Sequence, residues 1–456
     1  MKLAVVGGCG YVGLITSVGF ALMGHQVYAV DIDESKVLSL SKGISPVHED
    51  GLDEALSHSL REGNLTFTTD IESAAKGAEV VFVAVGSPSL FDGGTDMSQV
   101  KVAARLLAEA LDQYSVIAIK STVPAGTIEM VNQIIEEHSS QGLHADVVAN
   151  PEFLREGQGL ADFMFPNRIV VGTDSEKARE VMRTLYSDFI DVESKSTNIP
   201  DIAHEVPYIE TSIPAAQMIK YASNAYLATR ISFINEIAGI CEIVDADVKE
   251  VVEGLGYDKR IGWDYFQPGI GFGGPCLEKD IRGLIHFSAQ RGYQPSFMRA
   301  VIDRNDFQIQ QMVARVAQSL DGSIAGKSIA ILGLAFKPGT NDVRTSLSIR
   351  IIQQLLDLGA DLSAHDPIAI ENARQIIPHL RYYESESDAV SGADLVMVLT
   401  DWPQYSDLDW EAIGRVMKQK CMVDGRNLLD PRLMNQLGFR YSGVGYPILE
   451  KHEGSL

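Results

Sequence analysis

The sequence predicts an α/β fold in which two Rossmann-like, doubly wound parallel-sheet domains are joined by a central helical domain. Short apolar strand candidates alternate with helical segments in the N-terminal part of the chain, a pattern typical of parallel sheets covered by helices. From Lys327 the same order of strand, glycine turn, helix and strand begins again. Between these parts lies Ile213–Val244, whose sustained helical periodicity predicts one long spine helix.

The length of 456 residues exceeds what one hydrophobic core supports, so we expect several domains. Their predicted ranges are residues 1–206, 207–310 and 311–456. With 45% hydrophobic and 22% charged residues, the chain carries enough apolar surface to fold throughout.

The formal net charge is −23, from 61 acidic and 38 basic side chains. Such a balance opposes binding to nucleic acid and to anionic membranes. A small anionic ligand remains compatible with it, provided that basic groups gather locally around that ligand. We therefore expect a small-molecule partner.

Four cysteines, Cys9, Cys241, Cys276 and Cys421, are scattered without a CxxC pair. This predicts no disulfide framework, no metal site and a reducing compartment. The uncharged stretch after Lys2 contains too many glycines for a signal peptide and is better explained by a strand, a glycine turn and a buried helix. Because no other apolar run is long enough to cross a bilayer, we expect a cytoplasmic protein.

The individual elements follow from the apolar runs and the turn residues between them. A polar, proline-punctuated stretch, Asp191–Pro207, predicts a loop after the first sheet. The N-terminal strand candidates are Leu3–Val6, Gln26–Val30, Val80–Val85, Val116–Ile119 and Ile169–Val171, with helices at Val100–Leu111 and Thr127–Glu137. The C-terminal candidates are the strands Ser328–Leu332, Leu395–Leu399 and Met422-Val423, a strand ending at His365-Asp366-Pro367, and a helix at Leu347–Leu358.

The turn after the first strand carries a glycine fingerprint. Gly8, Gly10 and Gly13 fit GxGxxG between a strand and a helix. Glycines there permit a tight turn and let a pyrophosphate approach the helix N-terminus, where free N–H groups favour anions. Asp31, at the end of the next strand, would accept hydrogen bonds from a ribose 2′-OH and repel a 2′-phosphate. These residues predict an NAD site; a turn that binds no ligand is the alternative.

The most informative segment is Gly269–Asp280, a glycine-rich loop that should lead into a helix near Cys276. A thiol at a helix N-terminus has a lowered pKa and is nucleophilic near neutral pH. Asp280 follows four residues later, on the same helix face. For Cys241 and Cys421 we expect buried packing roles, and Cys9 in the cofactor turn is expected to pack as well.

Two further pairs of polar residues have the same spacing. Lys220 and Asn224 would project together from the long helix, as an ammonium and an amide suited to an oxyanion. Glu152 and Glu156 would share a helix face as acid/base or water-orienting groups. Solvated helix charges are the alternative for both pairs.

At these motifs the sequence resembles the UDP-glucose/GDP-mannose dehydrogenase family from the first strand nearly to the C-terminus. The matching segments are Gly10–Leu14, Val85–Pro88, Lys120–Pro124, Asn150–Gly157, Lys220–Asn224, Gly271–Asp280, Gly333–Pro338 and Asp424–Asn427. The resemblance implies an NAD-binding domain, a central domain with a dimer-forming helix, and a C-terminal domain that binds the UDP of a nucleotide sugar. It also implies two successive oxidations of a C6 alcohol to a carboxylate.

Carried onto this chain, the resemblance implies that Cys276 forms a thiohemiacetal and then a thioester. Lys220 and Asn224 stabilise oxyanions, Asp280 supports the cysteine, and Glu152 is the acid/base of thioester hydrolysis. Thr122, with Glu156, orients water or cofactor. Cofactor contacts are thus expected at Gly8, Gly10, Tyr11, Val12, Gly13, Asp31, Lys36, Ser87, Thr122, Glu156, Lys279 and Arg344, although a surface role for Lys36 is an equal alternative.

Substrate contacts are expected at Glu152, Phe153, Leu154, Arg155, Glu156, Lys220, Asn224, Arg260, Tyr265, Phe266, Gln267, Pro268, Gly269, Gly273, Lys337 and Arg426. Among these, Arg260 resembles an arginine that reaches the site from a neighbouring subunit, and a homodimer or larger assembly is implied. The expected substrate is UDP-glucose. The alternatives are GDP-mannose or a UDP-N-acetylhexosamine, a single-step 2-hydroxy-acid dehydrogenase, and a catalytically silent NAD-binding or nucleotide-sugar-binding protein.

Four features depart from the family pattern, and the mildest is Ser87, which stands where threonine is more frequent. The first turn, Gly7–Gly10, is one residue longer than usual, and Pro275, Leu277 and Glu278 surround the cysteine where other residues are usual. The stretch Asp191–Thr211 is longer than expected and has no family role.

Overall fold

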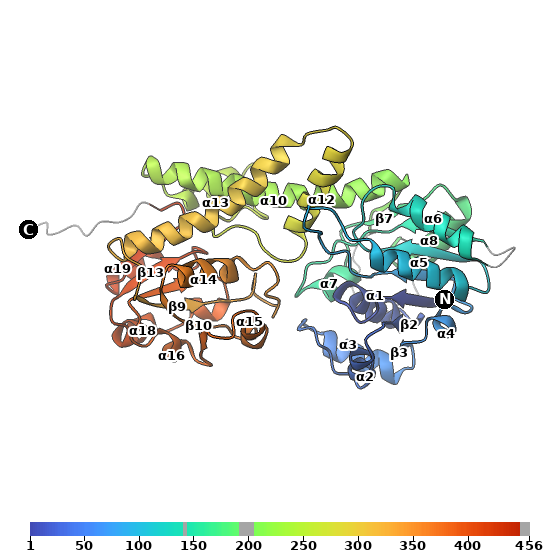
Figure 1. Ribbon diagram of the computed structural model, residues 1–456, viewed down its shortest axis with the longest axis horizontal. Coiled ribbons are helices and arrows are strands. Elements are labelled where there is room, and N and C mark those ends of the chain that lie inside the picture. The colour runs from blue at the N-terminus through green and yellow to red at the C-terminus, as the bar shows by residue number, and fades with distance from the viewer. Residues whose placement is uncertain (140–143, 191–204, 447–456) are drawn as a thin grey trace, which may run out of the picture. The chain divides into compact units, whose positions relative to one another are not determined.

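The computed structural model describes residues 1–139, 144–190 and 205–446, which form two compact units (Figure 1). The first unit comprises residues 1–223 and 282–292, and the second comprises the described part of 224–281 and 293–456. Two helices, α10 (Ile213–Ile243) and α12 (Leu277–Gln290), contribute residues to both units. The three-domain division predicted above stays a prediction.

The first unit is built on the predicted doubly wound sheet. Among the described residues its eight strands lie in the order β3-β2-β1-β4-β5-β6-β7-β8, and the β6–β7 pair alone is antiparallel. Strand order reverses at β1, which is where doubly wound sheets bind ligands. The strands are β1 (Lys2–Val6), β2 (Gln26–Val30), β3 (Leu65–Thr68), β4 (Val80–Val83), β5 (Ser115–Ile119), β6 (Ala145–Ala149), β7 (Ile169–Gly172) and β8 (Tyr208–Thr211).

Helices cover both faces of this sheet, and successive residues of the central strands pack into different cores. In β4, Val80 and Phe82 join one hydrophobic cluster, while Val81 and Val83 join the other. This alternation explains why the strand is apolar at every position. The helices are α1 (Tyr11–Leu22), α2 (Glu34–Ser41), α3 (Leu52–Arg61), α4 (Ile71–Ala75), α5 (Ser98–Ala110), α6 (Thr127–His138), α7 (Gly159–Met164), α8 (Glu176–Leu185) and α9 (Ser187–Ile190).

Strand β8 has no counterpart among the sequence predictions. It directly follows the predicted loop Asp191–Pro207, of which residues 191–204 lie outside the described part of the chain. Tyr208 pairs with Ile169, so β8 extends the sheet beyond β7 as a parallel edge strand. Because none of its residues is fully buried, the strand lacks the apolar run that marks the central strands.

The second unit repeats the doubly wound pattern, as predicted from Lys327 onward. Its described strands lie in the order β11-β10-β9-β12-β13-β14, and all pairs are parallel. They are β9 (Ser328–Leu332), β10 (Asp361–His365), β11 (Arg381–Tyr382), β12 (Leu395–Val398), β13 (Cys421–Asp424) and β14 (Arg440–Gly443). The helices around them are α11 (Val248–Gly256), α13 (Ser296–Ser319), α14 (Leu347–Asp357), α15 (Ile370–Ile376), α16 (Glu386–Val390), α17 (Pro403–Ser406), α18 (Trp410–Val416) and α19 (Pro431–Gln436).

The predicted spine is the single helix α10, 31 residues long. It ends one residue before the predicted limit because Asp245 adopts a left-handed φ of 55°, and the Ala246 N–H bonds back to the Cys241 carbonyl oxygen at 3.0 Å. A left-handed residue of this kind commonly stops a helix.

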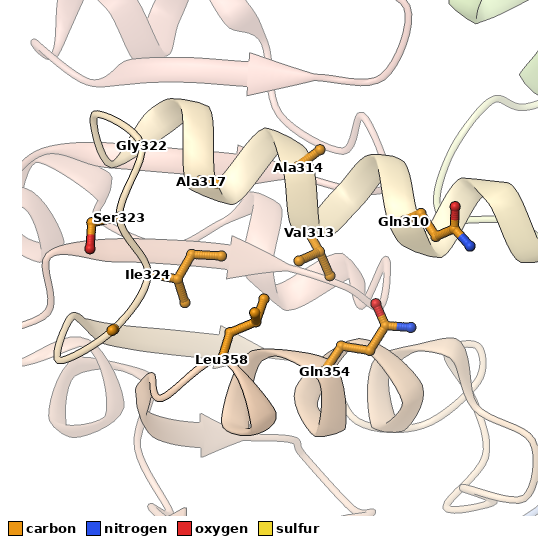
Figure 2. A pocket seen from close by; sticks show the side chains of 10 residues that line it. Gln310, Val313, Ala314, Ala317, Gly322, Ser323, Ile324, Gln354 and Leu358 are labelled. Carbon is orange, nitrogen blue, oxygen red and sulfur yellow. The ribbon is translucent and has the colours of Figure 1, made fainter.

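A groove of about 500 Å³ lies in the second unit between α13 and α14 (Figure 2). Val313 and Leu358 point into it, and its lining contains no ionisable side chain. Ligands of doubly wound sheets bind at the carboxyl ends of the strands rather than beside the helices. We therefore assign the groove no part in the chemistry.

The turn between β9 and α14 is fixed by the buried carboxylate of Asp366. One oxygen accepts the Leu334 and Ala335 N–H groups at 2.7 and 3.1 Å and the Trp402 indole N–H at 3.1 Å. The other accepts the Ile368 and Ala369 N–H groups at 3.1 and 2.9 Å. A single side chain thus satisfies five donors, which would be costly to leave unpaired inside the protein.

We predict that Asp366→Ala lowers the free energy of unfolding of the second unit by about 3 kcal/mol or more, because buried donors lose their acceptor. All three tryptophans, Trp263, Trp402 and Trp410, belong to this unit, so urea unfolding followed by tryptophan fluorescence reports on it. The control is Asp357→Asn, which replaces an exposed carboxylate on α14. A change in Asp366→Ala no larger than in this control would contradict the assignment.

Candidate active site

The turn after β1 has the shape that a dinucleotide pyrophosphate requires. A Cβ atom on Gly13 would lie 2.1 Å from the Gly7 carbonyl oxygen, and one on Gly8 would lie 2.7 Å from the Ala29 Cβ. A Cβ on Gly10 would meet nothing closer than 3.4 Å, so packing alone does not demand glycine there. Gly10 is the N-cap of α1 and supplies no capping side chain, which leaves the N-terminal N–H groups open to an anion.

The extra glycine in this turn is accommodated by a left-handed φ of 82° at Gly7. The N–H groups of Gly7 and Gly8 both bond to the Val30 carbonyl oxygen at 2.9 Å, so the longer turn is anchored to β2. The GxGxxG register that starts at Gly8 therefore opens α1 as the sequence predicts.

Asp31 stands at the end of β2 beside this turn. Its Oδ2 accepts the Cys9 N–H at 3.2 Å and its Oδ1 accepts the Asp33 N–H at 3.1 Å. The next residue, Ile32, is 93% exposed, which is unusual for isoleucine and fits an adenine ring that covers it. Lys36 forms a 3.8 Å ion pair with Asp33 on the exposed start of α2, in agreement with the surface alternative.

The four cysteines differ in their surroundings. Burial raises the pKa of Cys9 to about 12, and burial also raises the pKa values of Cys241 and Cys421. These three are buried, as their predicted packing roles require, whereas Cys276 is exposed. Only Cys276 therefore combines solvent access with a position suited to nucleophilic chemistry.

Loops after β4 and β5 meet at the same edge of the first sheet as the glycine turn. The Ser87 hydroxyl donates to the Thr122 carbonyl oxygen at 2.8 Å, and the Ser121 hydroxyl donates to the Val85 carbonyl oxygen at 2.6 Å. The carboxyl ends of neighbouring parallel strands thus bring Ser87 and Thr122 together, as expected for cofactor-side residues.

The predicted helix bearing Glu152 and Glu156 is wrong, because residues 151–158 form an irregular loop before α7. In this loop, acidic side chains accept hydrogen bonds from backbone N–H groups that would donate to carbonyl oxygens in a helix. Glu152 accepts the Leu154 N–H at 2.5 Å, and Asp162 accepts the Arg155 N–H at 2.8 Å and pairs with its guanidinium at 2.7 Å. Glu152 and Glu156 therefore do not share a helix face.

Within the first unit, Glu152 is bound to Lys220 of α10. The Lys220 Nζ lies 3.0 Å from a Glu152 carboxylate oxygen, and both side chains are less than 10% exposed. Lys220 and Thr122 also line one small cavity of about 10 Å³, the size of a single water molecule. Lys220 thus lines a water-sized space together with Thr122 and is also paired with Glu152.

Within the second unit, Cys276 immediately precedes the first residue of α12, as predicted. Its carbonyl oxygen accepts the Asp280 N–H at 3.0 Å, which closes the first helical turn. The Asp280 carboxylate is buried and accepts from the Asn224 amide and the Lys279 ammonium, both at 2.6 Å. Asn224, Lys279 and Asp280 therefore form one cluster that begins one turn after the thiol.

The loop before Cys276 is held by amide side chains. Gly269 donates to Asn235 at 2.8 Å, and Asn305 exchanges hydrogen bonds with Phe272 at 2.8 and 2.9 Å. A Cβ on Gly269 would lie 2.9 Å from the Gly425 carbonyl oxygen, so this loop packs directly on the segment after β13. Of the residues at 265–268, Phe266 and Pro268 are buried and Tyr265 and Gln267 are exposed.

The predicted basic ligand residues occupy different settings. Arg426 is partly buried, with 17% of its side chain exposed, and desolvation lowers its pKa. Its guanidinium donates to the carbonyl oxygens of Leu399 and Phe336 at 2.8 and 3.1 Å. Arg344 and Arg260 are largely exposed and pair with Asp342 and Asp258, two residues earlier in each case. The described contacts therefore do not join Arg260 to the other predicted site residues.

Comparison with known proteins identifies the family of the chain. Three family models match the chain: the NAD binding domain of the UDP-glucose/GDP-mannose dehydrogenase family over residues 1–190, its central domain over 214–307 and its UDP binding domain over 330–431. The chain belongs to the UDP-glucose/GDP-mannose dehydrogenase family. As a member of this family it is an oxidoreductase that uses NAD.

Relatives match along essentially the whole chain. A UDP-glucose 6-dehydrogenase of Bacillus subtilis (TuaD) is 41% identical over 455 residues, covering 100% of this chain and 95% of that protein. A UDP-glucose 6-dehydrogenase of Pseudomonas aeruginosa is 38% identical, covering 98% of each. The solved structure of a UDP-glucose dehydrogenase from Pyrobaculum islandicum superposes with a TM-score of 0.88 at 36% identity, covering 97% of each chain.

Family members with other substrates share the fold at lower identity. The structure of a UDP-D-ManNAc dehydrogenase from Pyrococcus horikoshii has a TM-score of 0.84 at 27% identity, covering 98% of this chain and 99% of that chain. Among the described helices of the present chain, none is long and apolar enough to span a bilayer.

Sequence reasoning assigned no role to three residues of the first unit: Glu49, Ile32 and Lys120. Glu49 and Lys120 are buried charged side chains, which sequence patterns alone do not identify, whereas Ile32 directly follows the predicted ribose ligand. Lys120 donates to the Asn150 amide oxygen at 3.2 Å, and burial lowers its pKa from 10.5 to about 8. The negative charge of the nearby Glu152 raises the pKa of Lys120, and the positive charge of Lys220 lowers it.

This lowered pKa predicts a pH-dependent stability. Between pH 8 and 10.5 the folded protein has released the Lys120 proton while the unfolded chain still binds it, so the free energy of unfolding rises with pH. Urea unfolding followed by circular dichroism from pH 7.5 to 10, roughly this window, measures it. Lys120→Met should remove the rise, and the exposed Lys101→Met should keep it. Parallel curves for the wild type and Lys120→Met would contradict the prediction.

Proposed function

We propose that this enzyme oxidises UDP-glucose to UDP-glucuronate in two NAD-dependent steps, through a covalent bond to Cys276. The observation that carries the proposal is the exposed thiol at the N-terminus of α12, one turn before a buried carboxylate held by Asn224 and Lys279. Relatives that are 37–41% identical over nearly the full chain are named UDP-glucose 6-dehydrogenases, which supports this substrate.

The chemistry divides into two oxidations and one hydrolysis. Bound NAD supplies the hydride acceptor for both oxidations, the first of which converts the C6 alcohol to an aldehyde. The Cys276 thiolate then forms a C–S bond to the aldehyde carbon, and the aldehyde oxygen becomes the oxyanion of a thiohemiacetal. The second oxidation converts this adduct to a thioester. Water adds to the acyl carbon, the C–S bond breaks, and the carboxylate leaves as the thiolate returns to Cys276.

The polar residues on α10 are the proposed oxyanion donors. Lys220 and Asn224 are four residues apart on one helix, so their side chains lie on successive turns of the same face. Each is held by a carboxylate, Lys220 by Glu152 at 3.0 Å and Asn224 by Asp280 at 2.6 Å. Donors fixed in advance stabilise a developing oxyanion without reorganisation.

Water activation is the proposed task of Glu152 together with Thr122, and Lys220 connects the two because it pairs with Glu152 and lines a cavity with Thr122. Glu152 takes the proton of the hydrolytic water, and the Thr122 hydroxyl orients it in the water-sized cavity that Thr122 and Lys220 line. On the thiol side, Asp280 accepts the Asn224 and Lys279 donors and keeps the first turn of α12 in place.

The two ligands, NAD and the nucleotide sugar, are each proposed to contact a separate set of residues. The glycine turn, Asp31, Ser87, Glu156, Lys279 and Arg344 are proposed to contact NAD. The nucleotide sugar is proposed to bind at residues 265–269, Gly273, Lys337 and Arg426, with Phe153–Arg155 near the sugar and Arg260 supplied by a second subunit. We retain 1–206, 207–310 and 311–456 as the proposed domains, and the four cysteines, scattered without a CxxC pair, support a cytoplasmic location.

The alternative functions differ in their substrates, in their need for Cys276 and in whether NADH is formed. GDP-mannose or a UDP-N-acetylhexosamine would use the same residues, and solved relatives that act on N-acetylated sugars are 25–27% identical. A single-step dehydrogenase of 2-hydroxy acids would not need Cys276, and a silent binding protein would form no NADH.

We predict about two NADH for each UDP-glucose consumed, because a primary alcohol loses four electrons on the way to a carboxylate, two for each hydride accepted. Absorbance at 340 nm with UDP-glucose, UDP-N-acetylglucosamine, UDP-N-acetylmannosamine and GDP-mannose measures both the ratio and the substrate. Cys276→Ser should form no uronate, whereas Cys241→Ser at a buried cysteine is the control. Full turnover by Cys276→Ser would rule out the covalent route.

A homodimer is the proposed assembly, through an apolar stripe on α10. Tyr226, Phe233 and Ile240 recur every seven residues and are 59%, 49% and 48% exposed. Exposed aromatic and aliphatic side chains at this spacing form one continuous helical face, which typically packs against another helix.

We predict that Phe233→Glu converts the dimer to a monomer, because a charge would be buried in an apolar contact. Light scattering coupled to size-exclusion chromatography measures the mass. Leu433→Glu on α19 is the matched control, since Leu433 is 48% exposed but lies off the stripe, and it should leave the mass unchanged. A dimeric Phe233→Glu protein would exclude this interface.

A further inference from the structure

The loop that carries Glu152 and Glu156 is held by Glu49, a residue about a hundred positions earlier in the chain. One Glu49 oxygen accepts the Gly157 N–H at 3.0 Å, and the other accepts the Leu160 N–H at 2.9 Å. The Glu49 side chain is buried, with 7% of the residue exposed. A buried carboxylate with backbone partners on both oxygens fixes the segment that donates to it.

Glu49 also completes the N-terminus of α7. The N-cap residue Gln158 makes no side-chain capping bond, and the Leu160 N–H belongs to the first turn of the helix. Glu49 accepts this N–H from outside the helix, in the role that an N-cap side chain usually has. The same carboxylate therefore fixes both the end of the loop and the start of the helix that follows.

The third contact joins this loop to the cofactor side of the unit. Tyr11 is the first residue of α1, directly after the glycine turn, and its hydroxyl lies 2.9 Å from Glu49 and 3.0 Å from the Arg155 carbonyl oxygen. A Cβ on Gly159 would lie 2.3 Å from that hydroxyl, so the tyrosine packs directly on the start of α7. Glu49 and Tyr11 thus connect the beginning of α1 with the Glu152–Leu160 segment.

We propose that Glu49 is a positioning residue that holds the Glu152–Gly157 loop against the start of α1 and thereby sets the rate of turnover. It acts through the backbone of Gly157 and Leu160 and through Tyr11. Glu156 of this loop and Tyr11 are two of the expected NAD contacts, whereas Asp31 and the glycine turn do not depend on Glu49, so altering Glu49 should change the KM for NAD much less than kcat. The inference rests on the proposed function, in which this loop supplies the base for thioester hydrolysis.

Glu49→Gln is the sharpest variant, because it keeps the size of the side chain and removes one acceptor. A carboxylate offers acceptors on both oxygens, whereas the amide turns one of them into an NH2 group that faces an N–H or O–H donor. Glu54→Gln on α3 is the matched control, since Glu54 is an exposed glutamate of the same segment. Tyr11→Phe removes the hydroxyl that contacts Glu49 and the Arg155 carbonyl oxygen, and it leaves the two backbone contacts of Glu49 in place.

The first measurement is amide hydrogen exchange of the protein without substrate, by mass spectrometry. Peptides covering residues 152–162 should exchange faster in Glu49→Gln than in wild type or Glu54→Gln, while peptides covering β1 and β2 should be unchanged. This readout does not depend on which sugar the enzyme oxidises. Equal protection of 152–162 in all three proteins would overturn the proposal.

The second measurement separates kcat from KM with the substrate that the NADH panel identifies. Glu49→Gln should lower kcat by roughly 10- to 100-fold, the scale of a displaced catalytic group, with the KM for NAD within about 3-fold. Tyr11→Phe should lower kcat less, and the double variant should fall short of the product of the two single effects. An unchanged kcat, or a loss confined to the KM for NAD, would overturn the proposal.

If Glu49→Gln does not fold, Tyr11→Phe decides by the same exchange and kinetic criteria. A wild-type protein that forms no NADH with any sugar would refute the proposed function. It would leave the exchange result to test the Glu49 anchor alone, so the two failures are distinguishable.

Discussion

Carboxylates removed from water must find donors, and this requirement fixes most of the functional segments of the protein. Glu152 is satisfied by Lys220, Asp280 by Asn224 and Lys279, and Glu49 by two backbone N–H groups and a tyrosine. Leaving any of these acids without its partners would cost far more than an average surface contact contributes. The positions of the reactive groups therefore follow from charge satisfaction as much as from apolar packing.

The two doubly wound units use the same acidic position differently. Asp31 and Asp366 each follow the strand next to the first strand of their sheet, beside the glycine turn. Asp366 accepts the Leu334 and Ala335 N–H groups of its own turn, so its carboxylate already takes the donors that a bound anion would need. Asp31 accepts one turn N–H and leaves the start of α1 uncapped. The difference explains why the first unit suits a dinucleotide and why the second must hold its ligand by other residues.

Much of this could be predicted from the sequence because periodicity and glycine spacing are local signals. The two sheets, the spine, the fingerprint turn and the helix that begins after Cys276 are all confirmed. The helix predicted for Glu152 and Glu156 failed because the acceptors that stabilise the loop are the carboxylates of Asp162 and Glu49, the latter about a hundred residues away. No local pattern reports such a partner. Edge strand β8 was missed for the related reason that it is hardly buried.

The central claim is that the sugar is bound covalently to Cys276 during turnover, and intact-mass spectrometry of a trapped enzyme tests it most directly. In Glu152→Gln, oxidation can proceed while hydrolysis of the thioester is slowed, so quenched samples should carry the acyl nucleotide sugar. Peptide mapping should locate this adduct on Cys276 and on no other cysteine. Steady NADH formation by the variant with unmodified Cys276 would contradict the account.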